Sequence, residues 1–202
     1  MRQRWLVIMV KEPLPGRVKT RLGQEIGMVQ AARWFRRQSL SLIGRLDDPR
    51  WQIVLAVTPD RAGMMSRVWP ESVARVPQGQ GDLGDRMGRL LRSMPPGSVC
   101  VIGADIPGIT RAHIARAFAA LGRADTVFGP AEDGGYWLVG LKRSRAVPPD
   151  LFQGVRWSSA HALSDTLKTL AGMSSRQVDV LADVDTKADL LRVSRGDTPP
   201  KA

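Results

Sequence analysis

The chain has 202 residues, of which 43% are hydrophobic and 24% are charged, and its formal net charge is +11. This length supports one domain with a sizeable core, and no apolar run reaches the roughly 18 residues that a membrane-spanning helix needs. The sequence therefore excludes a helical membrane protein, and we expect a single domain over residues 1–194 with a flexible tail over 195–202.

Short apolar runs alternate with helical patterns along the whole chain. Strands are expected at 5–10, 51–57, 72–77, 98–103, 125–130, 136–141 and 176–181. Helices are expected over most of 28–46, where apolar residues recur every three or four positions, and at 60–68, 83–93, 110–121, 159–171 and 186–193. Nearly continuous apolar strands separated by helices predict an α/β sheet that is covered on both faces. The sheet should be mixed, because the connection between 125–130 and 136–141 is too short for a crossover helix.

A basic loop, "KEPLPGRVKTRL", follows the first predicted strand. It lies within residues 1–50, which carry eleven Lys and Arg against four Asp and Glu. Its cations are Lys11, Arg17, Lys19 and Arg21. Arg offers forked donors and Lys a point charge, so the loop suits a polyphosphate. An ordinary solvated surface loop explains the same residues equally well.

The segment "PQGQGDLGDRM" at 77–87 places three glycines near a predicted helix start. Glycine permits close backbone approach, and free amides at a helix start favour an anion or a base edge. The spacing matches neither a P-loop nor a dinucleotide-binding fingerprint. Two histidines without zinc-ligand spacing and the absence of G-x-S-x-G also argue against a zinc site and a serine hydrolase.

Three carboxylates follow predicted strands at the edge where an open α/β sheet binds its ligands. Asp105 comes directly after "VCVIGA", and hard divalent cations prefer such carboxylate oxygens together with phosphate oxygens. Asp183 and Asp185 alternate in "DVDT", so only one of them is expected to face the site. A turn or helix-capping role is the alternative for all three. Cys100 cannot form an internal disulfide, so we expect a cytoplasmic protein.

The "EDGGYW" segment at 132–137 is a strong turn signal between two predicted strands. For Asp133 and Tyr136 two roles stay open: a structural role in the hairpin alone, or an added contact with a ligand at the same rim. Trp157 is expected to pack in the interior, with stacking on a sugar or base as the alternative.

Taken together, these segments resemble a known group of proteins. The sequence resembles the small bacterial nucleotide-diphospho-sugar transferases of GT-A-like fold that are labelled arsenosugar-biosynthesis-type glycosyltransferases. The matching segments are "VKEPLPGRVKTRL", "QGQGDLGDRM", "IGADIPGIT", "GPAEDGGYWLVGL" and "DVDTKADL", in the family's order across residues 10–191. The resemblance implies a three-layer α/β/α sandwich around a mostly parallel mixed sheet of about seven strands.

The resemblance also implies roles for individual residues. Asp105 and Asp185 would hold Mg²⁺ or Mn²⁺, and Asp105, Lys19 and Asp133 would take part in catalysis. The remaining implied contacts divide between a nucleotide donor and a small acceptor. The nucleotide would contact Lys11, Pro15, Gly16, Arg17, Lys19, Arg21, Gln80, Gly81 and Asp82. The acceptor would contact Asp133, Gly134, Gly135, Tyr136 and Trp157.

One departure keeps a second reaction open. The metal motif is "ADIP" and not a full Asp-x-Asp, and the basic loop also resembles that of 2-phospholactate guanylyltransferases and molybdenum-cofactor cytidylyltransferases. We therefore expect glycosyl transfer from a nucleotide-diphospho-sugar, with nucleotidyl transfer from an NTP to a phosphorylated molecule as the alternative. A non-catalytic nucleotide- or nucleic-acid-binding protein is the third hypothesis, although no nucleic-acid-binding module is recognisable.

Overall fold

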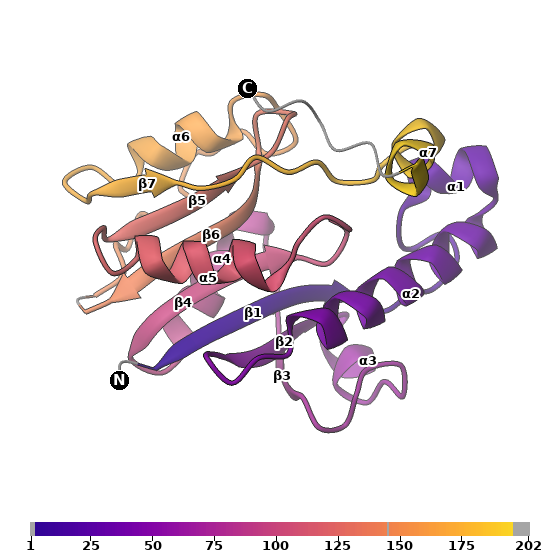
Figure 1. The fold of residues 1–202 in the computed structure, drawn as a ribbon, viewed down its shortest axis with the longest axis horizontal. Coiled ribbons are helices and arrows are strands. Elements are labelled where there is room, and N and C mark those ends of the chain that lie inside the picture. Colours follow the sequence, from indigo (N-terminus) through magenta and orange to yellow (C-terminus); the bar gives the residue numbers. More distant parts are fainter. Residues whose placement is uncertain (1–2, 145, 196–202) are drawn as a thin grey trace.

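A seven-stranded sheet forms the centre of the molecule (Figure 1) in the computed structural model, which describes residues 3–144 and 146–195. Its strand order is β3-β2-β1-β4-β6-β5-β7. The strands are β1 (Arg4–Lys11), β2 (Gln52–Thr58), β3 (Ala74–Pro77), β4 (Gly97–Gly103), β5 (Thr126–Pro130), β6 (Tyr136–Arg143) and β7 (Ser175–Gln177). Only β6 runs against its neighbours β4 and β5, so the predicted mixed, mostly parallel sheet is confirmed.

Helices cover both faces of this sheet and complete the three predicted layers. They are α1 (Thr20–Ile26), α2 (Met28–Leu46), α3 (Asp60–Met64), α4 (Leu83–Ser93), α5 (Arg111–Ala120), α6 (Ala162–Lys168) and α7 (Lys187–Arg195). Helices α2 and α5 pack on the face that is turned toward the viewer in Figure 1, and α4 and α6 pack on the opposite face. The α/β/α sandwich expected from the sequence is therefore present.

Strand β1 shows why the apolar runs form a central sheet. Leu6 and Ile8 point to the core under α2 and α5, whereas Val7 between them points to the core under α4 and α6. All three side chains are fully buried. Because successive side chains of a strand alternate between faces, a strand covered on both sides must be apolar throughout. Each such side chain contributes about 1.5–3 kcal/mol through burial.

The structure differs from the predicted elements at α1, α3, α6 and β7. Helix α1 begins at Thr20, inside the segment 11–22 that was predicted as a basic loop, and it runs on to Ile26. It is held by Leu22, which packs with Ala31 and Val184. Helices α3 and α6 are shorter than the predicted spans 60–68 and 159–171. Strand β7 ends at Gln177, and the chain then makes only one isolated bridge, from Leu181 to Ala131.

The described part of the chain ends with α7. The predicted tail 195–202 therefore lies outside the described residues, except for its first residue, which closes that helix. None of the helices in the described ranges combines the length and the apolar character needed to cross a lipid bilayer.

Candidate active site

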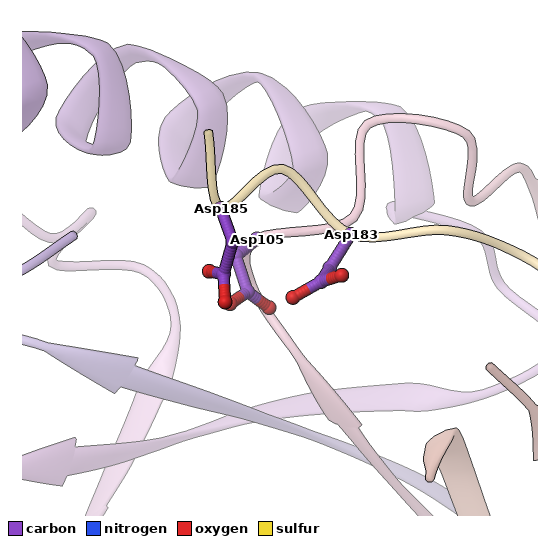
Figure 2. A group of neighbouring side chains, drawn as sticks. All are labelled: Asp105, Asp183 and Asp185. Atoms are coloured by element: carbon purple, nitrogen blue, oxygen red, sulfur yellow. The ribbon is translucent and has the colours of Figure 1, made fainter. Parts of the chain in front are cut away.

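Three carboxylates converge from two distant parts of the chain. Asp105 lies at the start of the loop that follows β4, and Asp183 and Asp185 lie in the extended segment that leads into α7. Figure 2 shows the three side chains gathered at one point. One ligand oxygen from each lies within 4.8 Å of the others. The amide of Val184 donates to the carbonyl of Asp105 at 3.4 Å, which ties the two segments together.

The prediction that only one of Asp183 and Asp185 faces the site is wrong. Both carboxylates join Asp105, because residues 182–185 form no regular strand and their side chains need not alternate between two faces. The helix after them begins with its own cap, in which the amide of Thr186 donates to Asp189 at 2.8 Å. Neither Asp183 nor Asp185 is therefore needed for capping.

Lys19 is the counter-ion of this carboxylate cluster. Its Nζ lies 2.7 Å from Asp105 Oδ2 and 2.7 Å from Asp185 Oδ1, and its side chain is only 7% exposed. Burial alone would lower the pKa of Lys19, but the two carboxylates outweigh burial and raise it. Arg21 adds a weaker, exposed ion pair to Asp185 at 3.3 Å.

The backbone of Lys19 explains how the chain brings this ammonium to the cluster. Lys19 precedes the first turn of α1 with φ 46° and ψ 50°, in the left-handed region. This conformation costs a residue with a side chain about 1–2 kcal/mol, so neighbouring structure must hold it in place. The two short ion pairs and the packing of Leu22 in the next turn supply that support.

Asp183 has a strongly perturbed carboxyl group. Burial, and then the charge of Asp185, raise the pKa of Asp183 to about 6, although Lys19 acts in the opposite direction. Asp105 and Asp133 add smaller repulsions of the same sign as Asp185. The cluster thus holds more negative charge than Lys19 neutralises, and a cation would relieve this repulsion.

The carboxylates open into a cavity of about 700 Å³ at the carboxyl ends of β1 and β4. Most of the site residues expected from the sequence line it. They are Lys11, Arg17, Lys19, Arg21, Asp105, Asp133, Gly135, Tyr136, Trp157 and Asp185. Ligands of open α/β sheets bind at this edge, and the volume is typical of a small-molecule site.

Six other expected site residues do not line this cavity: Pro15, Gly16, Gln80, Gly81, Asp82 and Gly134. Asp82 instead caps α4, where its side chain accepts from the amide of Asp85 at 2.9 Å. The carbonyls of Gln80 and Gly81 accept from Arg89 and Arg86. These contacts hold the segment before α4 against the helix, so its expected nucleotide contacts stay a prediction.

Several lining residues were not expected from the sequence, among them Gln78, Leu83, Arg86 and Met87. Leu83, Arg86 and Met87 lie in the first turns of α4. The sequence did contain a signal for these three residues. The predicted helix at 83–93 follows a predicted strand, so its first turns should lie at the edge of the sheet where the strands end. Gln78 is buried and donates to the carbonyls of Val10 and Ala56, which is a structural role.

Two aromatic rings also line the cavity. Tyr136 and Trp157 meet edge to face with 6.4 Å between ring centroids, and Phe152 supports Trp157 at 6.0 Å. The hydroxyl of Tyr136 forms a hydrogen bond with Thr166 at 3.2 Å. Burial raises the pKa of Tyr136, so this phenol stays neutral.

Comparison with known families assigns the chain to a group of bacterial proteins. Residues 43–159, more than half of the sequence, match the family described as uncharacterized protein conserved in bacteria, DUF2064. The chain belongs to this family. The match includes Asp105, Asp133 and Trp157 but ends before Asp183. None of the curated proteins matches this DUF2064 chain.

Several solved structures share this fold. A protein from Desulfovibrio desulfuricans G20, provisionally assigned as a nucleotide-diphospho-sugar transferase, is 27% identical, with a TM-score of 0.86 over 100% of this chain and 90% of that one. The 4-diphosphocytidyl-2C-methyl-D-erythritol synthase of Anaerococcus prevotii DSM 20548 is 10% identical, with a TM-score of 0.58 over 96% of both chains.

A third similar structure contains a metal and a nucleotide. Glucosyl-3-phosphoglycerate synthase of Mycobacterium tuberculosis, in complex with Mn²⁺, uridine diphosphate and phosphoglyceric acid, is 13% identical, with a TM-score of 0.54 over 99% of this chain and 80% of that chain. The DUF2064 chain therefore has the fold of nucleotide-diphospho-sugar transferases and of a cytidylyltransferase.

Proposed function

We propose that this protein is a metal-dependent transferase that uses a nucleotide-activated donor, and that it transfers a glycosyl group from a nucleotide-diphospho-sugar to a small acceptor. The observation that carries the proposal is one cavity in which three clustered carboxylates adjoin four cations of the β1–α1 segment. Carboxylates that can hold a divalent cation, set beside cations that bind phosphate, suit a diphosphate group.

The residues present fit a divalent cation. Asp105 and Asp185 would hold Mg²⁺ or Mn²⁺ with Asp183 as a third ligand, because their oxygens lie within 4.8 Å of one another and oxygen ligands are what these ions prefer. Lys19 already neutralises part of this charge at 2.7 Å from two of the carboxylates. A bound cation would offset the negative charge on the donor's phosphates and on the departing nucleoside diphosphate.

The basic residues would bind and orient the donor. Lys11, Arg17 and Arg21 are exposed in the cavity, and they would contact the phosphates from the side of the β1–α1 segment. Lys19 would stabilise the charge that develops on the leaving group as the bond to the sugar breaks. Arg86 and Leu83, at the start of α4, would lie toward the base.

Glycosyl transfer is preferred because the 27% identical protein from D. desulfuricans carries that provisional assignment. Nucleotidyl transfer from an NTP is the second candidate. A cluster of four cations suits a triphosphate, and the fold is also that of a cytidylyltransferase. We also propose that the protein is one of the arsenosugar-biosynthesis-type glycosyltransferases. A cytoplasmic location is proposed as well, and the buried, unpaired Cys100 supports it.

A ligand panel separates these candidates. Thermal stability is measured with Mn²⁺ and each of four NTPs, UDP-, GDP- and ADP-sugars, and again with EDTA. Metal-dependent stabilisation by one nucleotide-sugar supports glycosyl transfer and identifies the donor, whereas stabilisation by one NTP alone favours nucleotidyl transfer. Salt-sensitive binding of nucleic acid without any response to nucleotides would instead support the third hypothesis.

A variant pair tests the assignment of the carboxylates. Asp105→Asn should keep the fold and lose metal-dependent donor binding, while Asp150→Asn, an exposed carboxylate outside the cavity, should keep both. Unchanged donor binding by Asp105→Asn would refute the metal role of this residue.

A further inference from the structure

The cavity has two walls of different chemistry. The donor wall, as we name it, comes from residues before β4 and includes all five cations of the cavity: Lys11, Arg17, Lys19, Arg21 and Arg86. The acceptor wall comes from the connection between β5 and β6, the first residue of β6 and the segment that leads into α6. Its members are Ala131, Asp133, Gly135, Tyr136, Trp157, Ser158, Ser159 and Ala162. This division rests on the proposed function, in which the basic side receives the donor phosphates.

No described residue of the acceptor wall is a Lys or an Arg. Two guanidinium groups near this segment are already neutralised by carboxylates. Arg156, next to Trp157, forms two short hydrogen bonds to Asp165, at 2.7 and 3.1 Å. Arg192, which approaches Glu132 at 3.5 Å, lies closer to Asp189, at 3.0 Å. Neither guanidinium lines the cavity, so neither is available to bind a ligand there.

The charges that do face the acceptor wall are negative. Asp133 is exposed on this wall, and its Oδ1 accepts only from the amide of Gly135, at 2.9 Å, which leaves its charge without a cationic partner in the described part of the chain. Asp183, a member of the carboxylate cluster, lines the same cavity. A phosphate group on an acceptor would meet these carboxylates with no guanidinium or ammonium to compensate, and proteins normally hold phosphates with such cations.

The rest of the acceptor wall offers rings and hydroxyls. Tyr136 and Trp157 present aromatic surface whose position is fixed by Phe152 and by the hydrogen bond to Thr166. Ser158 is exposed beside Trp157, and Ser159 already bonds the backbone at 2.7 Å. An apolar ring face flanked by a carboxylate and a hydroxyl complements a molecule with C–H surface and several hydroxyl groups.

From this asymmetry we infer that the acceptor is a hydroxyl-bearing molecule without negative charge, of the polyol or sugar class, and not a phosphorylated metabolite. Asp133 and Trp157 are the residues that determine this preference. Asp133 accepts hydroxyl protons and repels anions, and Trp157 covers the apolar face of the acceptor. The inference also disfavours the nucleotidyl-transfer alternative, because that reaction was expected to use a phosphorylated acceptor.

Binding of matched neutral and phosphorylated probes tests this inference. The full chain is first saturated with Mg²⁺ and with UDP or GDP, whichever the donor panel selects, so that the donor wall is occupied. Methyl glucoside and glycerol are then titrated against glucose 6-phosphate and glycerol 1-phosphate, with saturation-transfer NMR as the readout. We expect at least one neutral probe to bind tenfold or more tightly than its phosphorylated partner.

Charge reversal supplies the matched variants. Asp133→Lys should shift the neutral-to-phosphorylated affinity ratio by tenfold or more toward the phosphorylated probe, because it places a cation on the acceptor wall. Asp150→Lys adds the same charge outside the cavity and should leave the ratio within twofold of the original. Trp157→Leu should weaken neutral probes while Trp157→Phe retains them, and nucleotide binding should persist in both.

Three outcomes would overturn the inference: equal or tighter binding of the phosphorylated probes, binding of none of the neutral probes, or an affinity ratio that Asp133→Lys does not change. Failure of the nucleotide itself to bind in the first step would instead count against the proposed function. The two failures are therefore distinguishable within one experiment.

Discussion

Replacing Lys19 with methionine removes the cation that neutralises the carboxylate cluster while keeping an unbranched side chain of similar length. The Lys19 side chain is 7% exposed and its ammonium lies 2.7 Å from both Asp105 and Asp185. The metal-free variant would therefore leave three neighbouring carboxylates with only the exposed Arg21 nearby. We expect lower stability without metal and tighter binding of a divalent cation.

The structure sets the size of both effects. Breaking a fully buried ion pair costs about 3–5 kcal/mol. Because Asp105 and Asp185 are 32% and 38% exposed, solvent screening reduces the expected loss to about 2 kcal/mol. For a chain of this size that lowers the Tm by about 4–8 °C. A unit charge about 4 Å from a divalent ion costs about 2 kcal/mol in a water-like dielectric, so losing Lys19 should tighten Mn²⁺ binding about 30-fold.

Two measurements on the same protein samples check this expectation. Thermal melts in EDTA give the change in Tm, and electron paramagnetic resonance of free Mn²⁺ gives its Kd. Lys11→Met is the matched control, because Lys11 lines the same cavity but is exposed and forms no ion pair within the described residues. Its Tm should stay within about 1 °C and its Kd within about threefold of the original protein.

Equal behaviour of Lys19→Met and Lys11→Met would refute the role of Lys19 as the counter-ion of the cluster. An unchanged Tm in EDTA would mean that the cluster does not need an internal cation. An unchanged Kd for Mn²⁺ would mean that the metal does not bind beside the Lys19 ammonium, and the assignment of Asp105 and Asp185 as ligands would fall with it.

Three further predictions follow from the described contacts. Asp183→Asn should raise the metal-free stability at pH 7 by about 1 kcal/mol, since burial and Asp185 hold the Asp183 pKa near 6 and its charge then opposes folding. This gain in stability should fade as the pH falls from 6 toward 4, because Asp183 of the original protein is then protonated in the folded state. Thermal melts that show the same gain at every pH in this range would contradict the raised pKa of Asp183. Gly134→Ala should cost about 2 kcal/mol or more in urea unfolding, because φ is +82° and the added Cβ would collide with the backbone of Ala160. Thr110→Ala should cost about 1 kcal/mol through loss of the α5 cap while Thr110→Ser keeps it, and equal midpoints in urea would exclude a capping role.

The strands were predictable because burial on both faces leaves an unambiguous pattern. Strand β1 is apolar at every position from Leu6 to Val10, and β4 repeats this in its own buried stretch. Helix α1 was not predictable in the same way. It has only seven residues, it follows two prolines and a glycine, and it buries little beyond Leu22. Its stability comes from packing with Val184, a contact between segments far apart in the sequence.

The residue types of the site were predictable, but their partners were not. A carboxylate after a central strand and cations after the first strand indicate a phosphate and metal site at one edge of a sheet. Lys19 can contact both Asp105 and Asp185 only because β4 pairs with β1 and the segment before α7 packs beside the end of β4. Local sequence contains no signal for either arrangement. The joint approach of Asp183 and Asp185 likewise depends on an irregular backbone that alternation rules do not describe.

The late position of Asp183 and Asp185 in the chain has a consequence for biosynthesis. All seven strands are complete by Gln177, so a nascent chain can assemble its sheet while it still has only one of the three clustered carboxylates. Chains begin to fold from the N-terminus during synthesis. A metal ion stabilises the fold only once all of its ligands are present and brought together. Divalent-cation affinity would therefore depend on the last segment of the chain, and a chain that ends before Asp183 would lack two of the three carboxylates as well as Val184, which packs against α1.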